Sequence, residues 1–233
     1  MTLTADSVDA WYADLTEIDV RRELLRRTLS SMERGRAGRF RFERDRLNYE
    51  RRTYLLRLLL ADYSGSEPAQ IQFHLGKHGK PECTNFPRIR FNLTHSNGRA
   101  LYAFRLDGEV GVDLECIRPR AGVELVARSS FTESERQQIN AFPGEERLAA
   151  FYRCWTLKEA YVKARGEGLS ARLDSFEVRV FDYCQLSASD SERWRLFPLP
   201  LFPGYVGALC AEAPCFAPHV RGATACQGRF LPL

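Results

Sequence analysis

Two long helical patterns, one in each half of the chain, constrain the fold more than any other feature. Residues 45–63 place leucines at helical spacing, with arginines on the opposite side. Residues 145–165 form a second pattern, which Gly166 and Gly168 bring to an end. Short segments of strand character occur in both halves. These segments are residues 71–75, 89–93, 100–106, 109–117, 176–181, 194–199 and 204–212. The Asn97-Gly98 pair predicts a turn between the second and third of them. Thr132 and Glu135 predict a capping box that begins a further helix.

This distribution predicts an α+β protein with two similar lobes. Each half offers a helix and several strands, and the middle of the chain lies near residue 107. We therefore expect an N-terminal lobe of residues 1–106 and a C-terminal lobe of residues 107–233, although no sequence repeat establishes their similarity. Residues after Pro214 are weakly patterned, and we expect them to be irregular.

The composition is that of an ordinary globular protein. The 233 residues are 44% hydrophobic, which is enough for a sizeable packed core. No run of about 18 apolar residues occurs, and the first residues carry acids where a signal peptide has basic residues. Seven cysteines form no C-x-x-C pair and have no zinc-binding spacing. We expect a cytoplasmic protein with reduced, mostly buried thiols.

The positive charge is concentrated in one segment. The net charge is +4, but thirteen arginines face five acids between Arg21 and Arg57. Such a segment attracts nucleic acid, a phosphorylated ligand or an acidic protein surface. A solvated helical face would have the same composition, so the charge alone leaves these alternatives open.

Two carboxylates are placed side by side on a predicted strand. Asp113 and Glu115 are two residues apart, so both side chains point to the same face. A divalent ion would relieve their repulsion, and an all-oxygen ligand set suits Mg²⁺. The alternative is an exposed strand face, which is often polar.

The second helical pattern carries charges on an apolar helix. Trp155, Glu159 and Lys163 follow one another at i,i+4 spacing and share a face, while Lys158 lies about 100° away. An exposed Glu-Lys pair of this spacing contributes only about 0.3–0.5 kcal/mol. Because the segment is too apolar for a free surface, Glu159 is instead a candidate third ligand of the ion at Asp113 and Glu115.

Two further segments could bind an anion. His95 follows a strand beside Thr94, and hydroxyl and imidazole groups at a strand end can bind phosphate; a structural histidine is the alternative. Lys77 and Lys80 lie on a glycine-interrupted loop that can approach an anion closely. This loop is not a P-loop, because the required spacing and the following helix are absent.

Four motifs, HGKP, FNLTHS, GVDLE and WTLKEAYVKARGEGLS, occur in this order between roughly residues 34 and 180. Together they resemble the 4′-phosphopantetheinyl transferases, specifically the large, two-lobed, monomeric class named for the activator of surfactin synthetase. The resemblance implies two α+β lobes related by a pseudo-twofold axis. It also implies transfer of phosphopantetheine from coenzyme A to a serine of an apo acyl or peptidyl carrier protein, with release of 3′,5′-ADP. Fatty-acid, polyketide and nonribosomal-peptide carriers all remain open as partners.

The resemblance also assigns roles to the charged residues of the second half. Asp113, Glu115 and Glu159 match the family's Mg²⁺ ligands, with Mn²⁺ as an alternative ion, and through the metal Asp113 also serves the bound coenzyme A. Lys158 and Lys163 match two helix lysines that serve the phosphates and the reacting centre. Glu159 and Lys163 are therefore the expected catalytic residues.

A second set of matches concerns the phosphates and nucleotide of coenzyme A. His95 with Thr94 matches a contact to the coenzyme A phosphates. Lys80 with Pro81 matches the loop that borders the nucleotide.

The basic segment matches more loosely. Arg36 and Arg39 lie near residues that the family uses for the ribose 3′-phosphate. Asn48 stands where the family often has a basic residue, so Arg51 or Arg52 is expected to substitute for it.

Two other functions compete with transfer. A basic nucleic-acid-binding module would use the arginines with the interleaved aromatic residues Phe40, Phe42 and Tyr49, but it leaves the three carboxylates without a role. A Mg²⁺-dependent nucleotide phosphohydrolase would use the same metal site, with water in place of serine. The transferase interpretation predicts neither nucleic-acid nor membrane binding.

Overall fold

The computed structural model describes residues 1–76, 78–168, 171–179, 185–226 and 229–232, and it confirms the predicted α+β class. A five-stranded sheet has the order β12-β11-β1-β5-β4. Its strands are β1 (Val8–Asp14), β4 (Ile89–Ser96), β5 (Arg99–Leu106), β11 (His219–Cys226) and β12 (Arg229–Pro232). Strands β4 and β5 form an antiparallel hairpin whose turn residues Asn97 and Gly98 have φ values of 43° and 80°. The turn expected at this Asn-Gly pair is confirmed.

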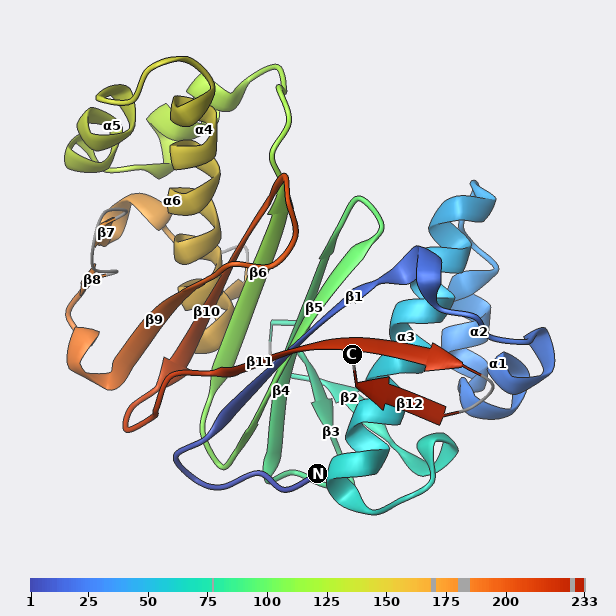
Figure 1. Ribbon diagram of the computed structural model, residues 1–233. Helices are drawn as coiled ribbons and strands as arrows, with labels where there is room; N and C mark the ends of the chain where they lie inside the picture. Colours follow the sequence, from blue (N-terminus) through green and yellow to red (C-terminus); the bar gives the residue numbers. More distant parts are fainter. Residues whose placement is uncertain (77, 169–170, 180–184, 227–228, 233) are drawn as a thin grey trace.

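The C-terminal segment corrects the expectation of an irregular tail. Strand β11 pairs in parallel with β1, from Asp9 opposite His219 to Tyr12 opposite Gly222, and β12 pairs antiparallel with β11. The prediction was wrong because strand formation here depends on pairing with the distant β1, which local composition does not reveal. These strands lie in the sheet of the N-terminal segment (Figure 1), while the division of the chain near residue 107 stays a prediction.

Helices α1 (Arg22–Thr28), α2 (Ser31–Ala37) and α3 (Glu43–Ser64) lie beside the first sheet (Figure 1). The apolar side of α3 packs on this sheet, where Leu55 and Leu59 are fully buried with Phe104. Gly65 ends the helix with a φ of 68°, which a residue with a Cβ adopts only at a cost. The short strands β2 (Phe73–Leu75) and β3 (Pro81–Cys83) pair antiparallel after it.

The second sheet has the order β6-β10-β9, and helix α6 packs across it. Its strands are β6 (Val110–Cys116), β9 (Trp194–Leu199) and β10 (Tyr205–Glu212). Helix α6 (Gly144–Arg165) ends at Gly166, as the sequence predicts. Around it lie α4 (Val123–Ser130), α5 (Glu133–Asn140), β7 (Glu177–Arg179) and β8 (Gln185–Ser187). The capping box predicted for α5 is present.

The two sheets meet along β4 and β6. A buried apolar cluster lies between them and includes Val8, Leu101, Val112 and Leu209. Side chains of β4 also bond to the backbone of β6, since Asn92 Oδ1 accepts from Val112 N at 2.9 Å. This junction brings the polar end of β4 alongside the carboxylates of β6.

Within the described ranges, no helix is long and apolar enough to cross a membrane.

Candidate active site

The centre of the candidate site joins β6, β4 and α6 through Asp113. The Asp113 side chain is 6% exposed, and Lys163 Nζ lies 2.6 Å from its Oδ1. Thr94 Oγ1 donates to the same oxygen at 3.3 Å, and Lys163 Nζ also lies 3.5 Å from Thr94 Oγ1. The structure therefore brings together three of the residues that the sequence singled out.

A glycine permits this close approach of helix and strand. A Cβ built on Gly111 would lie 2.2 Å from the carbonyl oxygen of Ala160 and 2.3 Å from the amide nitrogen of Ala164. Only a residue without a side chain fits here, because both contacts are to helix backbone that cannot rotate away. The backbone of α6 thus lies directly on β6, at the level where Lys163 reaches Asp113.

The other two carboxylates lie in the electrostatic field of Asp113. Burial and the charge of Asp113 both raise the pKa of Glu115, whose carboxylate accepts a hydrogen bond from Ser96 Oγ at 3.0 Å. Burial, followed by the charge of Asp113, likewise raises the pKa of Glu159. Such repulsion is what a bound cation relieves.

The donor chemistry fits a divalent ion, although the carboxylates do not form a ready-made cage. Asp113 Oδ2 is buried and has no hydrogen-bond partner, which marks it as an oxygen suited to a ligand. Among the residues that the structure describes, no group of three or more His, Cys, Asp or Glu side chains is arranged to hold a metal. Lys163 instead provides the positive charge beside Asp113.

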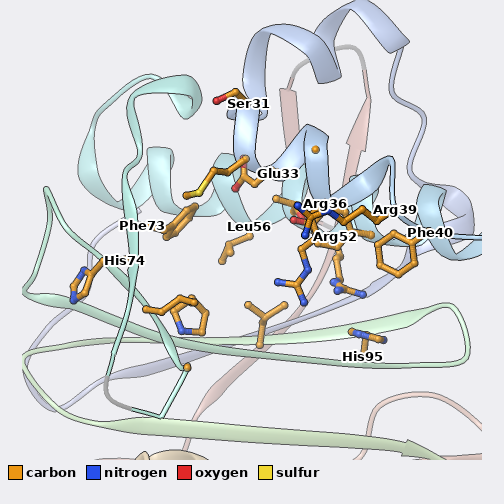
Figure 2. A pocket seen from close by; sticks show the side chains of 18 residues that line it. Ser31, Glu33, Arg36, Arg39, Phe40, Arg52, Leu56, Phe73, His74 and His95 are labelled. Atoms are coloured by element: carbon orange, nitrogen blue, oxygen red, sulfur yellow. The ribbon is translucent and has the colours of Figure 1, made fainter.

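A large cleft adjoins this centre and carries uncompensated positive charge. It has a volume of about 1180 Å³ and is lined by residues of α2, α3, β2, β4 and the loop before β3. In Figure 2, Arg36, Arg39 and Arg52 gather on one wall, with His95 across from them. In the part of the chain that the structure describes, no carboxylate forms an ion pair with these three arginines.

An aromatic ring lies beside two of these arginines. The guanidinium carbons of Arg36 and Arg52 lie 5.4 and 5.0 Å from the ring centroid of Tyr49. Their attraction to the ring faces keeps two like charges close without a carboxylate. Burial, as the largest cause, lowers the pKa of the Arg52 guanidinium, so an anion in the cleft would relieve a charge that is costly to bury.

His95 connects the cleft to the carboxylate centre. Its ring lines the cleft, and the charges of Arg52 and Lys163 both disfavour the imidazolium. Desolvation of the ring, as the largest cause, and these two charges lower the pKa of His95 to about 4, although part of the residue is exposed to solvent. Thr94, the neighbour of His95 in β4, contacts Asp113 and Lys163, so the cleft ends beside the carboxylate centre.

Lys158 lies elsewhere, which corrects the expectation that it meets phosphates. Its side chain is fully buried, and Nζ lies 2.5 Å from Glu135 Oε1 and 2.7 Å from the carbonyl oxygen of Phe176. Because Lys158 is about 140° around the helix from Lys163, it faces the core formed by α5 and β7. Nothing in the sequence identified Glu135 as its partner, since Glu135 already had a role in the capping box.

The loop residues are divided between two environments. Pro81 lines the cleft, as expected for a residue that borders a nucleotide. Lys80 does not reach into the cleft in this structure, because Nζ lies 2.9 Å from Glu109 Oε2 and donates to the carbonyl oxygen of Val110 at 3.0 Å. Lys77 lies outside the described residues.

Of the two arginines expected to substitute for a basic residue at Asn48, the structure favours one. Arg52 lines the cleft, whereas Arg51 is not among the lining residues. Adjacent positions on α3 point about 100° apart, so only one of them can face the cleft. Tyr49, which the sequence suggested only as an interleaved aromatic residue, lines the cleft one turn earlier.

The chain is similar to known 4′-phosphopantetheinyl transferases over most of its length. The model of the 4′-phosphopantetheinyl transferase superfamily matches residues 109–210. The 4′-phosphopantetheinyl transferase HetI of Nostoc sp. is 34% identical over 202 residues, which cover 85% of each chain. The transferase Sfp of Bacillus subtilis is 30% identical over 167 residues, covering 70% of this chain and 72% of that protein.

Among solved structures, a holo-(acyl-carrier-protein) synthase from Bacillus anthracis in complex with CoA (3′,5′-ADP) is 22% identical, with a TM-score of 0.40. The match covers 45% of this chain and 94% of that one, and at this TM-score it adds nothing to the assignment. The identity to HetI extends over most of both chains and includes the strand and helix that form the carboxylate centre. The chain belongs to the 4′-phosphopantetheinyl transferase superfamily.

Proposed function

We propose that this site transfers the 4′-phosphopantetheine group of coenzyme A to a serine hydroxyl of an apo carrier protein, with release of 3′,5′-ADP. The observation that carries the proposal is the position of the arginine cleft beside the carboxylate centre, where His95 of the cleft is next in β4 to Thr94 of the centre. A substrate whose nucleotide carries a ribose 3′-phosphate and a reacting 5′-diphosphate matches such a site.

The cleft would hold the 3′,5′-ADP part of coenzyme A. Arg36, Arg39 and Arg52 line it without carboxylate partners, so phosphate groups would supply the missing negative charge. The neutral His95 imidazole lies between these arginines and Lys163, where the diphosphate would pass. Thr94 adds a hydroxyl on the same strand.

A divalent cation, Mg²⁺ in our proposal, would be held by Asp113, Glu115 and Glu159. The partnerless Oδ2 of Asp113 and the mutual repulsion of the three carboxylates support this assignment. When bound, the ion would neutralise charge on the diphosphate and make its phosphorus easier to attack.

The reaction exchanges one P–O bond for another. The serine oxygen forms a bond to the phosphorus attached to pantetheine, and the bond from that phosphorus to the oxygen of the 3′,5′-ADP phosphate breaks. Glu159 would accept the serine proton. Lys163 would stabilise the negative charge that develops on the departing 3′,5′-ADP.

Incubation with coenzyme A, Mg²⁺ and an apo carrier protein, followed by mass spectrometry of the carrier, tests the proposal. Transfer adds one phosphopantetheine unit to the carrier serine. Cleavage of coenzyme A without a mass gain on any of a panel of fatty-acid, polyketide and peptide carriers would instead support the nucleotide phosphohydrolase. That panel, compared by rate, would also identify the carrier, and a monomeric cytoplasmic enzyme remains part of the proposal.

A further inference from the structure

A buried arginine of α3, Arg57, contacts elements of both walls of the cleft. Its side chain is 2% exposed. Nε donates to both carboxylate oxygens of Glu33, at 2.9 and 3.2 Å. Nη1 donates to the carbonyl oxygens of Pro68 and Ile71, each at 2.9 Å. The guanidinium also lies 5.1 Å from the ring centroid of Phe73.

One of these contacts fixes helix α2. The Glu33 carboxylate that pairs with Arg57 also accepts from the backbone N–H of Ser30 at 2.7 Å, which closes the capping box at the start of the helix. Arg36 lies one turn further along α2 and lines the cleft. The position of Arg36 therefore depends on the ion pair between Glu33 and Arg57.

The other contacts fix the opposite wall. The carbonyl oxygens of Pro68 and Ile71, which accept from Arg57, belong to the segment that leads into β2. Phe73 and Leu75 of β2 line the cleft. In Figure 2, Glu33 and Phe73 lie toward the same end of the cleft, away from Phe40. A single guanidinium thus ties both walls to α3.

The chemistry of arginine suits this position. Its planar fork directs five N–H donors to a carboxylate and to carbonyl oxygens at the same time, which a lysine ammonium on a flexible stem cannot do with the same geometry. A buried charge is also difficult to rearrange when Nε and both hydrogens of Nη1 are bonded and Nη2 lies 2.9 Å from Glu33 Oε2. The cleft is therefore held open at a fixed width before any ligand binds.

We infer that Arg57 is a positioning residue that sets the separation of the two cleft walls, and thereby the affinity for the nucleotide part of coenzyme A, without touching it. Arg57 is not among the lining residues, so the effect acts through Arg36 and Phe73. The inference depends on the proposed function, because it takes coenzyme A to be the occupant of the cleft.

The test compares steady-state kinetics of Arg57→Lys and Glu33→Gln with those of the unmodified enzyme. For Arg57→Lys we expect the KM for coenzyme A to rise by about tenfold or more while kcat at saturation changes by less than about twofold. We also expect the preference for coenzyme A over dephospho-coenzyme A, which lacks the 3′-phosphate, to fall, since displaced Arg36 loses that group. Glu33→Gln should also raise the KM for coenzyme A and lower the preference for coenzyme A over dephospho-coenzyme A, by smaller factors.

Arg105→Lys is the matched control. Arg105 is another buried arginine, 4% exposed, that donates to the backbone carbonyls of Ala5 at 3.3 Å, Pro214 at 2.6 Å and Glu212. It lies outside the cleft lining, so its substitution should lower the melting temperature without changing the KM for coenzyme A.

Calorimetric titration with 3′,5′-ADP separates the possible failures. If the unmodified protein does not bind 3′,5′-ADP, the proposed function is wrong and the inference fails with it. If the unmodified protein binds and Arg57→Lys binds equally well, only the inference is overturned. Equal increases in KM for Arg57→Lys and Arg105→Lys would also overturn it, because the effect would then follow general stability. If Arg57→Lys does not fold, an unchanged KM for coenzyme A in Glu33→Gln would overturn the inference.

Discussion

Lys163 Nζ lies 2.6 Å from Asp113 Oδ1, which joins the last turn of α6 to the middle of β6. The pair depends on Gly111, where the helix backbone rests on the strand without a side chain between them. It also places an ammonium group beside the oxygen Oδ2 that has no partner. The same contact therefore links the packing of α6 on β6 to the chemistry of the site.

Replacing Lys163 by alanine should lower kcat by about 10²- to 10³-fold, because it removes a positive charge placed where negative charge develops. Transfer to an apo carrier, followed by mass spectrometry, measures this loss. Arg88→Ala is the control, since Arg88 is an ion-paired basic residue outside the site, and its partner is Asp107. Equal losses in both variants would contradict a specific role for Lys163.

Glu159→Gln should lower kcat by about 10²- to 10⁴-fold, the range typical of a lost general base. At neutral pH the same variant should be more stable than the unmodified protein, because burial and Asp113 raise the pKa of the native carboxyl. An acid with a raised native pKa binds more protons in the folded state than in the unfolded state. Ionised Glu159 therefore destabilises the folded protein increasingly as the pH rises above the unfolded pKa of about 4.3.

Thermal unfolding at several pH values measures the difference in stability between Glu159→Gln and the unmodified protein. The stability gain of Glu159→Gln should be absent at low pH, where the carboxyl is protonated in both states, and should increase toward pH 7. Glu145→Gln, an exposed position at the start of the same helix, should show neither the gain nor the loss of turnover. Normal turnover by Glu159→Gln would remove Glu159 from the mechanism.

Gly111→Ala should destabilise the protein by about 3 kcal/mol or more, since overpacking against backbone cannot be relieved by a side-chain rotation. The new Cβ would lie 2.2 Å from the carbonyl oxygen of Ala160. Chemical denaturation measures the change. Gly35→Ala is the control: no atom lies within 4 Å of its Cβ position on α2, and alanine there should stabilise by about 0.5–1 kcal/mol.

Sequence patterns predicted the long helices and the hairpin turn because their signals are local. The spacing of leucines, Gly166 and the Asn97-Gly98 pair each act over a few residues. Strand β11 escaped prediction because its stabilising partner, β1, is more than two hundred residues away. A sequence contains no direct record of that pairing.

The candidate site shows the same limit for side chains. The i,i+4 spacing correctly placed Glu159 and Lys163 on one face, and the two-residue spacing placed Asp113 with Glu115. Lys158 was assigned by motif alone, although helix geometry already turned it away from Lys163. Its burial against Glu135 of another helix is a tertiary contact, which only the structure reveals.

That burial gives Lys158 a different expected phenotype. Lys158→Met should destabilise the protein by about 3–5 kcal/mol, because it leaves the Glu135 carboxylate buried and unpaired. Adding Glu135→Gln should recover part of the loss. Below the unfolding temperature the KM for coenzyme A should be unchanged, and a selective increase in KM would restore the interpretation in which Lys158 meets phosphates.

His95 predicts a dependence of ligand binding on pH. Its pKa of about 4 lies below the ordinary value, so between about pH 4 and 6.5 the unfolded chain binds more protons than the native one. Stability should therefore rise with pH through this window. An anion in the cleft offsets the charges of Arg52 and Lys163, so binding of 3′,5′-ADP should raise the pKa of His95 and take up protons.

Calorimetry at about pH 5.5, in two buffers that differ in ionisation enthalpy, measures that uptake directly, because this pH lies inside the window between the lowered and the ordinary pKa. The unmodified protein should show a buffer-dependent binding enthalpy that disappears at pH 8. His95→Asn should lose the buffer dependence while still binding. His74→Asn is the matched control, since His74 also lines the cleft and its side chain is half exposed. If the buffer dependence persists in His95→Asn and is lost in His74→Asn, the protons are taken up at His74. That result would contradict the predicted contact between His95 and the phosphates.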